Sequence, residues 1–494
     1  MLLARLLTYL RPYWREAGLA FLFIVTGSAV GLAGPYLTKI AIDQYLVRRQ
    51  AEGLGALALL YLAALGLAFA CTYGQQYLLQ NTGQRVMQDI RRQIFAHLQQ
   101  LHVAYFDRNP VGRLMTRVTS DVDAVNELFT SGVVTVFQDL FTLFGIMGVL
   151  LAMNWRLALV TFSVIPALFL VTNWFRRGSR ESFREVRRWV ARINAFLQEH
   201  LTGMTVVQLF RREERSRQAF SEINRGHAQA NMDQIFYYAV FYPAIDLLAV
   251  LAVALILLVG GGKVLAGTLT VGALVAFVQY SERFWQPISD LSEKFNILQS
   301  AMASSERIFT LLDTPLQVVA PPQPVRLPEV EGRVGFEGVS FAYHGARDGQ
   351  EPDWVLRDID FAVEPGRSVA LVGATGAGKT SVISLLARFY DVQQGRVTLD
   401  GVDVRDLDPR QLRSALALVL QDVHLFSGTI ASNIRLGSDI SDERVRAAAR
   451  AVGAQRFIDA LPQGYETEVK ERGATLSVGQ KQLLSFARAL AHDP

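Results

Sequence analysis

The sequence predicts a multi-domain membrane protein, in which an all-α part that crosses the membrane six times precedes an α/β domain. Hydrophobic residues make up 51% of the 494 residues and charged residues only 19%, whereas soluble domains carry about 25% charged residues. The long apolar stretches lie before about residue 300. Beyond a proline-rich stretch, short β-rich runs alternate with helical ones, which is the pattern of an α/β domain.

The first part contains six stretches that can cross a bilayer, which takes about 20 mostly apolar residues in a helix. We expect spans at about residues 17–46, 54–80, 132–153, 156–175, 236–260 and 265–299. The gaps after the second and fourth spans are long and rich in helix formers, so they are predicted to extend the spans as helices. Both gaps are also rich in arginine. Because positive residues favour the cytoplasmic side, both loops and both ends of the six-span unit are predicted to be cytoplasmic.

The chain divides into four expected segments. Residues 1–16 are amphipathic and do not resemble a signal peptide, so we expect an elbow helix in the membrane interface. Residues 17–310 form the six-helix transmembrane domain, and residues 311–330 form a proline-rich linker. Residues 331–494 form the α/β domain, with predicted strands at Val334–Phe341 and Ser368–Val372 and a predicted helix at Thr380–Tyr390.

A phosphate-binding motif marks the second domain. Gly373–Thr380 matches G-x-x-x-x-G-K-[ST] in full, between the predicted buried strand Ser368–Val372 and the start of a helix. Glycines let backbone N–H groups close around phosphate oxygens, and the helix N-terminus favours negative charge. Lys379 is expected to reach the β- and γ-phosphates, and the Thr380 hydroxyl to bind Mg²⁺. An ordinary glycine-rich turn does not require this lysine or this context.

Further segments identify a family by resemblance. Gln421–Ile434, Thr467–Gly473 and Leu476–Gln480 follow the phosphate loop in the order of the Q-loop, X-loop and signature motif of ABC exporters. Tyr343 resembles the aromatic residue of the A-loop, which stacks on adenine. Tyr105–Val122 and Glu199–Phe210 resemble the two coupling segments of the family's transmembrane domain. The resemblance covers essentially the whole chain.

The resemblance implies ATP and Mg²⁺ as cofactors, with two ATP molecules sandwiched head to tail between two ATP-binding domains. It implies catalytic roles for Lys379 and Gln421, and Mg²⁺ contacts from Thr380 and Gln421. The nucleotide contacts that it implies are those of Tyr343, Gly373, Ala374, Thr375, Gly376, Ala377, Gly378, Lys379, Thr380, Ser381, Gln421, Ser477, Val478, Gly479 and Gln480.

The sequence departs from the family pattern at two places. The signature reads Leu-Ser-Val-Gly-Gln, with Val478 where the family has glycine. Valine is bulkier and stiffer than glycine, as in exporters built from two different halves, so a heterodimer is favoured over a homodimer. The sequence also stops at Pro494, before the family's Walker B strand, catalytic glutamate, D-loop and switch histidine. We therefore expect a C-terminally truncated ATP-binding domain that cannot hydrolyse ATP by this mechanism as printed.

The function implied by the resemblance is ATP-driven export of a hydrophobic or amphipathic substrate, either a small molecule, a lipid or a peptide. A lipid flippase on the same scaffold and a non-transporting or channel-like homologue are the alternatives. The expected partners are a second half-transporter and membrane lipid. The protein is placed in the cell (inner) membrane as a multi-pass protein with its ATPase domain in the cytoplasm. A net charge of +4 gives no nucleic-acid signature.

Charged residues also occur within the apolar stretches. Asp139 and Asp246 are functional candidates because charges in a membrane are costly. Each would either line a wet cavity or form a structural pair with another helix. Lys39 and Asp43 lie one turn apart near the outer end of the first span, and we expect them to pair locally.

Overall fold

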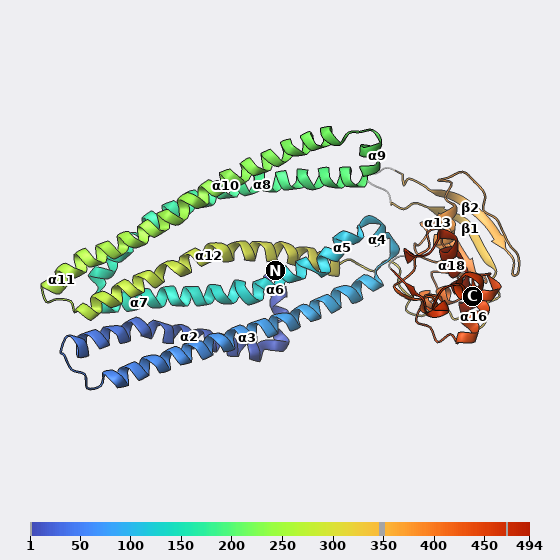
Figure 1. The fold of residues 1–494 in the computed structure, drawn as a ribbon. Coiled ribbons are helices and arrows are strands. Elements are labelled where there is room, and N and C mark those ends of the chain that lie inside the picture. The colour runs from blue at the N-terminus through green and yellow to red at the C-terminus, as the bar shows by residue number, and fades with distance from the viewer. Residues whose placement is uncertain (1, 345–350, 471–472) are drawn as a thin grey trace. The chain divides into compact units, whose positions relative to one another are not determined.

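A computed structural model describes residues 2–344, 351–470 and 473–494 (Figure 1). The chain forms two units. The helical unit comprises Met1–Ile94 and Thr116–Leu312, and the mixed unit comprises Phe95–Met115 and Asp313–Pro494. The helical unit ends at Leu312, and the predicted linker begins at residue 311. Phe95–Met115 differs from the expected boundaries, because it lies within the predicted transmembrane segment and yet packs with the mixed unit.

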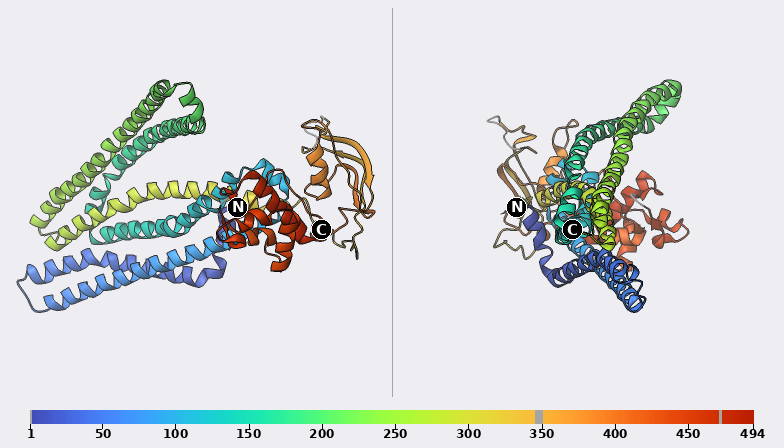
Figure 2. Two further views of the ribbon diagram at one scale, coloured as in Figure 1. Left: turned by 45° about the vertical axis from the view of Figure 1, so that its right-hand side comes forward. Right: turned by 90° about the vertical axis from the view of Figure 1, so that its left-hand side faces the viewer.

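The helical unit is built from long helices joined by short turns (Figures 1 and 2). Several continue through a short π-helical stretch, which closes wider turns than an α-helix. Its elements are α1 (Leu2–Thr8), the 3₁₀ turn η1 (Arg11–Tyr13), α2 (Trp14–Ile40), η2 (Ala41–Leu46), α3 (Leu54–Gln100), α5 (Val111–Val118), α6 (Ser120–Glu127), η3 (Leu128–Gly132), α7 (Val133–Phe162), α8 (Ile165–Thr202), α9 (Met204–Leu209), α10 (Glu213–Leu255), η4 (Ile256–Gly260), α11 (Gly261–Leu265) and α12 (Val271–Leu312), with the ends of α3 and α5 shared with the mixed unit.

The long helices extend well past a bilayer, as predicted for the two long loops. α3 has 47 residues, which at 1.5 Å per residue is about 70 Å, against a hydrocarbon core of about 30 Å. Four continuous helical stretches among the described residues are long and apolar enough to cross a membrane. They are Arg11–Leu46, Leu54–Gln100, Val111–Phe162 and Glu213–Leu265. By this measure, four of the six predicted spans are found among the described residues.

The other two predicted spans, at 156–175 and 265–299, also lie largely on helices. The backbone of α7 leaves helical geometry at Asn154 (φ −161°, ψ 100°), between the third and fourth predicted spans. The fourth span is divided between the end of α7 at Phe162 and α8, which begins at Ile165, close to the arginines that follow Trp174. The sixth span lies on α12, where Glu282 and Arg283 interrupt the apolar sequence.

The helical unit packs through apolar side chains and close approaches at glycine. Ile146, Leu150, Phe277 and Tyr280 belong to a buried cluster between α7, η4 and α12. α8 and α10 run side by side as a long hairpin (Figures 1 and 2). On this hairpin Gly178 leaves room for the ring of Tyr237, and a side chain there would collide with it.

The predicted pairing of Lys39 with Asp43 is wrong in this structure. The Asp43 carboxylate accepts hydrogen bonds from Thr270 Oγ1 at 2.6 Å and from the backbone N–H of Gly272 at 2.8 Å. Lys39 lies over the ring of Tyr36, 5.2 Å from its centroid. The physical reason is that the first N–H groups of α12 have no partner within their own helix, so the nearby carboxylate caps that helix.

The mixed unit combines a small antiparallel sheet with a helical part. The order of the main sheet is β2-β1-β3-β4 and β5 pairs with β6. The predicted strand Val334–Phe341 is confirmed as β1. Its elements are α4 (Val103–Arg108), β1 (Val334–Phe341), β2 (Leu356–Val363), α13 (Lys379–Leu386), β3 (Gln394–Leu399), β4 (Val402–Asp403), α14 (Pro409–Ser414), β5 (Gly428–Thr429), α15 (Ile430–Arg435), α16 (Asp442–Ala451), α17 (Gln455–Asp459), the 3₁₀ turn η5 (Gly464–Glu466), β6 (Glu468–Val469) and α18 (Val478–His492).

The predicted strand Ser368–Val372 is wrong in this structure. The segment has no strand geometry and is exposed, with 92% of Val372 accessible to solvent. A strand inside a parallel sheet needs neighbours on both edges to pair its backbone. Among the described residues the main sheet is antiparallel and ends at β2 and β4, so this segment has no such neighbours. The helix predicted at Thr380–Tyr390 is present as the shorter α13.

Candidate nucleotide-binding site

The phosphate loop has the backbone that its glycines predict. Gly376 and Gly378 take left-handed conformations with φ of +89° and +82°. Gly378 is the residue before α13, and a Cβ there would lie 2.6 Å from Leu356 Cδ2. Both the conformation and the space therefore require glycine at this position. The exposed loop of residues 373–377 then leads directly into the N-terminus of an eight-residue helix.

Lys379 folds over this loop. Its Nζ donates to the carbonyl oxygens of Gly373 at 2.9 Å and Ala374 at 2.8 Å. These bonds place a positive charge at the mouth of the loop, next to the free N–H groups of α13. Thr380 follows in the first turn and is exposed. An anion at this helix start would meet the ammonium group, the helix N-terminus and a hydroxyl together.

Tyr343 is held next to the phosphate loop. Its hydroxyl lies 2.8 Å from Ser381 Oγ, in the first turn of α13. The Gln393 side chain forms two hydrogen bonds with the backbone of Ala342. It accepts from Ala342 N at 3.0 Å and donates to Ala342 O at 2.9 Å. The ring of Phe341 packs edge-on against Tyr343, 4.9 Å between centroids. Ser381 itself is buried and has Tyr343 as its partner.

The signature segment forms the start of α18. Ser477 and Gln480 make a reciprocal capping box, with Ser477 N donating to Gln480 Oε1 at 2.9 Å and Gln480 N donating to Ser477 Oγ at 3.3 Å. Val478 is 72% exposed, and a Cβ on Gly479 would meet nothing within 4 Å. The N-terminus of this 15-residue helix is therefore presented outward, with Val478 at its tip.

Gln421 lies in an exposed, irregular segment that leads toward a well-anchored turn. Asn433 ties this turn by accepting from Phe426 N and donating to Phe426 O, both at 2.8 Å. Arg488 of α18 donates to Asn433 O at 2.9 Å and to His424 O at 3.2 Å. Burial lowers the pKa of the Arg488 guanidinium. Arg488 thus links the signature helix to the segment after Gln421.

The structure brings some of the predicted site residues together and leaves others apart. Tyr343, Ser381 and the phosphate loop form one cluster. Within residues 2–344, 351–470 and 473–494, no hydrogen bond joins that cluster to Gln421 or to Ser477–Gln480. Sequence reasoning missed Gln393, Arg488 and Tyr390, whose ring lies 5.1 Å from that of Tyr343. No motif marks these three residues, since their roles come from contacts distant in sequence.

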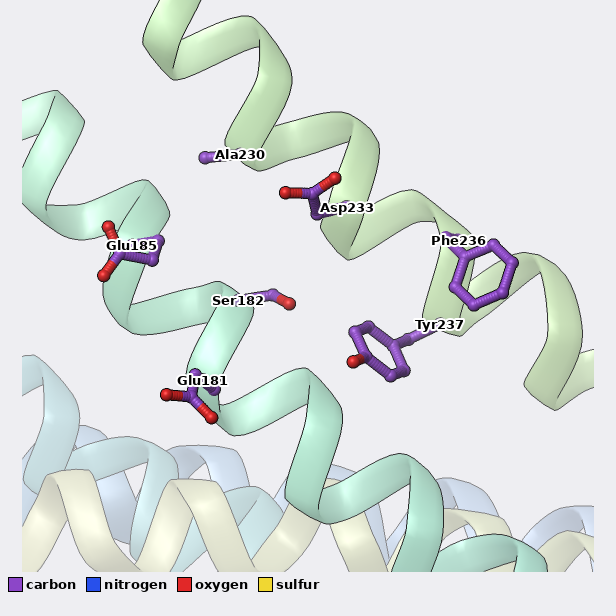
Figure 3. A pocket seen from close by; sticks show the side chains of 7 residues that line it. All are labelled: Glu181, Ser182, Glu185, Ala230, Asp233, Phe236 and Tyr237. Carbon is purple, nitrogen blue, oxygen red and sulfur yellow. The ribbon is translucent and has the colours of Figure 1, made fainter.

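A cavity of about 320 Å³ lies apart from this cluster, between α8 and α10 (Figure 3). Its lining includes three carboxylates and two aromatic residues. Its lining residues are Glu181, Ser182, Glu185, Ala230, Asp233, Phe236 and Tyr237. Two of these carboxylates already have partners: Glu185 pairs with Arg188, and Asp233 accepts from Gln229 at 3.1 Å. We therefore interpret the cavity as a packing gap between α8 and α10.

The cluster formed by Tyr343, Ser381 and the phosphate loop fits a nucleoside triphosphate. It supplies a left-handed glycine loop, a helix N-terminus, an ammonium group and a neighbouring aromatic ring. No group of three or more His, Cys, Asp or Glu side chains gathers into a metal site in the described part of the chain. A Mg²⁺ ion held here would take a hydroxyl from Thr380 and most of its ligands from phosphate and water, as Mg²⁺ does in nucleotide sites.

Known proteins resemble both parts of the chain. A family model described as ABC transporter transmembrane region matches residues 17–288, and one described as ABC transporter matches residues 356–494. An uncharacterized ABC transporter ATP-binding protein of Bacillus subtilis, YknV, is 36% identical over 99% of this chain and 81% of its own length. A probable multidrug resistance ABC transporter of the same organism, YheH, is 36% identical over 94% of this chain and 68% of its own. An ATP-dependent lipid A-core flippase of Thiobacillus denitrificans is 35% identical over 99% of this chain and 84% of its own length.

Proposed function

Because this chain belongs to the ABC transporter family, as a transmembrane region fused to an ATP-binding domain of the exporter type, we propose that it works as one half of a dimeric exporter. It is a multi-pass membrane protein with a cytoplasmic ATPase domain, and it couples ATP to the export of hydrophobic substrates. The observation that carries the proposal is the phosphate loop opening α13 beside Tyr343, in a chain whose other unit is built of membrane-length helices.

The proposed roles follow from the local geometry. Gly376 and Gly378 shape the loop, and Lys379 exchanges its two carbonyl partners for phosphate oxygens. Thr380 offers its hydroxyl to Mg²⁺, and Tyr343 stacks on the adenine ring. Bound ATP supplies the phosphoryl group whose transfer to water drives the cycle, and Gln421 is proposed to sense the Mg²⁺ ion and the attacking water.

The proposal is tested on the full-length protein with Lys379→Ala. Loss of the ammonium group removes a charge-assisted contact to phosphate, which should weaken binding by at least about tenfold. Binding is followed with a fluorescent N-methylanthraniloyl ATP. The matched control is Arg410→Ala, which removes an exposed cation at the start of α14 on the same unit. Undiminished binding by Lys379→Ala would overturn the assignment of the loop.

The partner is proposed to be a second, different half-transporter. The exposed N-terminus of α18 supports this, because Ser477 and Gly479 point outward and are available to a phosphate loop on another chain. Val478 makes this signature unlike that of the family. In a heterodimer the site on Lys379 would use the partner's signature and carry most of the turnover. Steady-state ATPase of the two-chain complex, with each half's lysine changed separately, should fall more with Lys379→Ala. Equal losses would favour a symmetric dimer.

The substrate is proposed to be a hydrophobic or amphipathic small molecule, lipid or peptide. Relatives named for multidrug resistance, for fatty acid transport and for a lipid A-core flippase support this breadth. A lipid flippase is the second candidate. Proteoliposomes assayed with a drug, lipid and peptide panel separate the two, because a flippase moves labelled lipid between leaflets and leaves the drugs untouched.

A further inference from the structure

A second cavity lies in the helical unit, between α3 and the start of α7. It measures about 430 Å³, within the range of about 300–1,000 Å³ typical of small-molecule pockets. Four glutamines and three threonines line it together with one leucine, and none of these side chains is charged. Gln75 is buried, and its Nε2 donates to Oε1 of Gln138 at 2.9 Å. That pair joins the two helices, as polar side chains do in membranes, and the other polar side chains of the lining are not needed for it.

The threonines of this lining present acceptors. Each threonine hydroxyl donates its proton to a backbone carbonyl three or four residues earlier. These bonds are Thr72 to Ala68 at 2.9 Å, Thr130 to Asn126 at 3.0 Å and Thr135 to Gly132 at 3.1 Å. A hydroxyl whose proton is used in this way offers a ligand its oxygen lone pairs, whereas a glutamine amide both donates and accepts. A ligand that brings several O–H donors of its own therefore fits this lining.

An ionised ligand group would fit the same lining poorly. Removing a charge from water costs far more than removing a hydroxyl, and the cost is offset only by a nearby opposite charge. The lining supplies no carboxylate, ammonium or guanidinium group. Sugar and polyol hydroxyls are uncharged and both donate and accept, so they match the cavity better than a phosphate or an amine does.

The depth of the cavity is that of lipid headgroups. At 1.5 Å per residue, residues 72–80 lie about 27–39 Å along α3 from its start at Leu54. The hydrocarbon core is about 30 Å thick, so on the predicted topology these residues reach the cytoplasmic boundary of the bilayer. Tyr73 and Tyr77 lie on the same turns, exposed and with stacked rings, and tyrosine is typical of the membrane interface. Phe69, one turn further into the membrane, is also exposed and offers apolar surface to a lipid chain.

We propose that this cavity, the glutamine–threonine pocket, binds the headgroup of an amphipathic substrate, and that this headgroup is uncharged and carries several hydroxyls, as in a glycolipid. The proposal rests on the proposed export function and narrows its substrate class. The pocket replaces the water around the headgroup with hydrogen bonds, while the lipid chain stays in the cytoplasmic leaflet.

The test uses the full-length protein with its partner subunit and three dialkylglycerols that carry the same NBD fluorophore. Their third position holds glucose, phosphate or an ammonium group. Native mass spectrometry in a polyoxyethylene detergent, which has no sugar of its own, measures the apparent Kd of each lipid. The glucolipid should bind the wild-type protein about tenfold more tightly than either charged lipid, because the pocket offers no opposite charge.

Two exposed lining residues are changed, since their replacement leaves the bond between Gln75 and Gln138 intact. Gln76→Leu and Thr72→Val should each weaken glucolipid binding about fivefold, as the loss of one hydrogen bond allows, and Thr72→Ser should restore it. Gln76→Glu should weaken glucolipid binding and strengthen binding of the ammonium lipid, which a change in a merely structural glutamine would not do. Gln88→Leu, exposed on α3 outside the pocket, is the matched control and should change no Kd.

Two results would overturn the proposal. If a charged lipid binds the wild-type protein as tightly as the glucolipid, the headgroup class is wrong. If Gln76→Leu and Thr72→Val bind the glucolipid as the control does, the pocket is not its site. Both measurements are made without ATP, so failure of the export function is seen separately. A wild-type complex in proteoliposomes that moves neither the three lipids nor a lipophilic drug with ATP would overturn export, and with it the role of the glucolipid as a substrate.

Discussion

A buried carboxylate ties the end of α12 to α6, and its removal gives a quantitative prediction. Asp121 is 6% exposed. It accepts hydrogen bonds from Ser304 Oγ at 3.0 Å and from the Arg307 guanidinium, including Nε at 3.0 Å. Arg307→Ala would leave the carboxylate buried with Ser304 as its remaining partner in this cluster.

The expected magnitude follows from the burial of the two partners. Breaking a buried ion pair from one side costs about 3–5 kcal/mol. The Arg307 side chain is 50% exposed, so water can reach the vacated site and screen the carboxylate. We therefore expect Arg307→Ala to lower the free energy of unfolding by about 2 kcal/mol. Asp121→Asn should cost less, about 1 kcal/mol, because the freed Arg307 can turn into solvent.

Hydrogen exchange read by mass spectrometry measures this directly. Since 1.4 kcal/mol is a factor of ten, Arg307→Ala should speed exchange of α6 and the end of α12 about 30-fold, and Asp121→Asn about fivefold. The control is Arg188→Ala, which breaks an exposed pair with Glu185 on α8 and should change exchange there by less than about threefold. Exchange in Arg307→Ala that is no faster than in the control would refute the reasoning. So would a larger effect from Asp121→Asn.

Three further predictions concern the loop, the topology and the signature. Gly378→Ala should abolish most binding of N-methylanthraniloyl ATP and destabilise the unit by about 1–2 kcal/mol. Gly401→Ala, at φ +80° with open space around it, should strain the backbone and leave nucleotide binding unchanged. Equal losses of nucleotide binding in the two variants would contradict this. In a Cys71→Ala background, an impermeant thiol reagent should label cysteine at position 50 on intact cells and spare cysteine at 110 and 207, and the reverse pattern would contradict the arginine-based topology. Val478→Gly should raise ATPase turnover of the two-chain complex several-fold, and unchanged turnover would show that valine does not impair that site.

Much of the fold could be predicted because local signals there agree with the final contacts. The aromatic and β-branched residues Phe336, Val339 and Phe341 of the predicted strand are buried in β1, and two glycines of the phosphate loop, Gly376 and Gly378, are where the backbone has positive φ. Hydrophobic length predicted the helices, and the scarcity of proline and glycine in the long loops predicted that the helices would continue. Each of these features depends on residues close together in the sequence.

The remaining features depend on partners that local pattern does not specify. The apolar segment Ser368–Val372 reads as a strand, but strand geometry also requires a neighbouring strand to pair with it. Asp43 has a lysine one turn away and still caps α12, because free helix N–H groups are closer to its oxygens. Tyr390 carries no motif at all, and only the fold reveals that its ring packs against that of Tyr343.

The central claim is that ATP bound at the 373–381 loop drives movement of a hydrophobic substrate across the membrane. The most direct measurement is ATP-dependent uptake of a fluorescent lipophilic probe into proteoliposomes that hold the full-length protein with its partner, with the ATPase domains outward. We predict uptake with ATP, and its loss in Lys379→Ala although the protein reconstitutes normally. Uptake that continues at the wild-type rate in Lys379→Ala would contradict the claim.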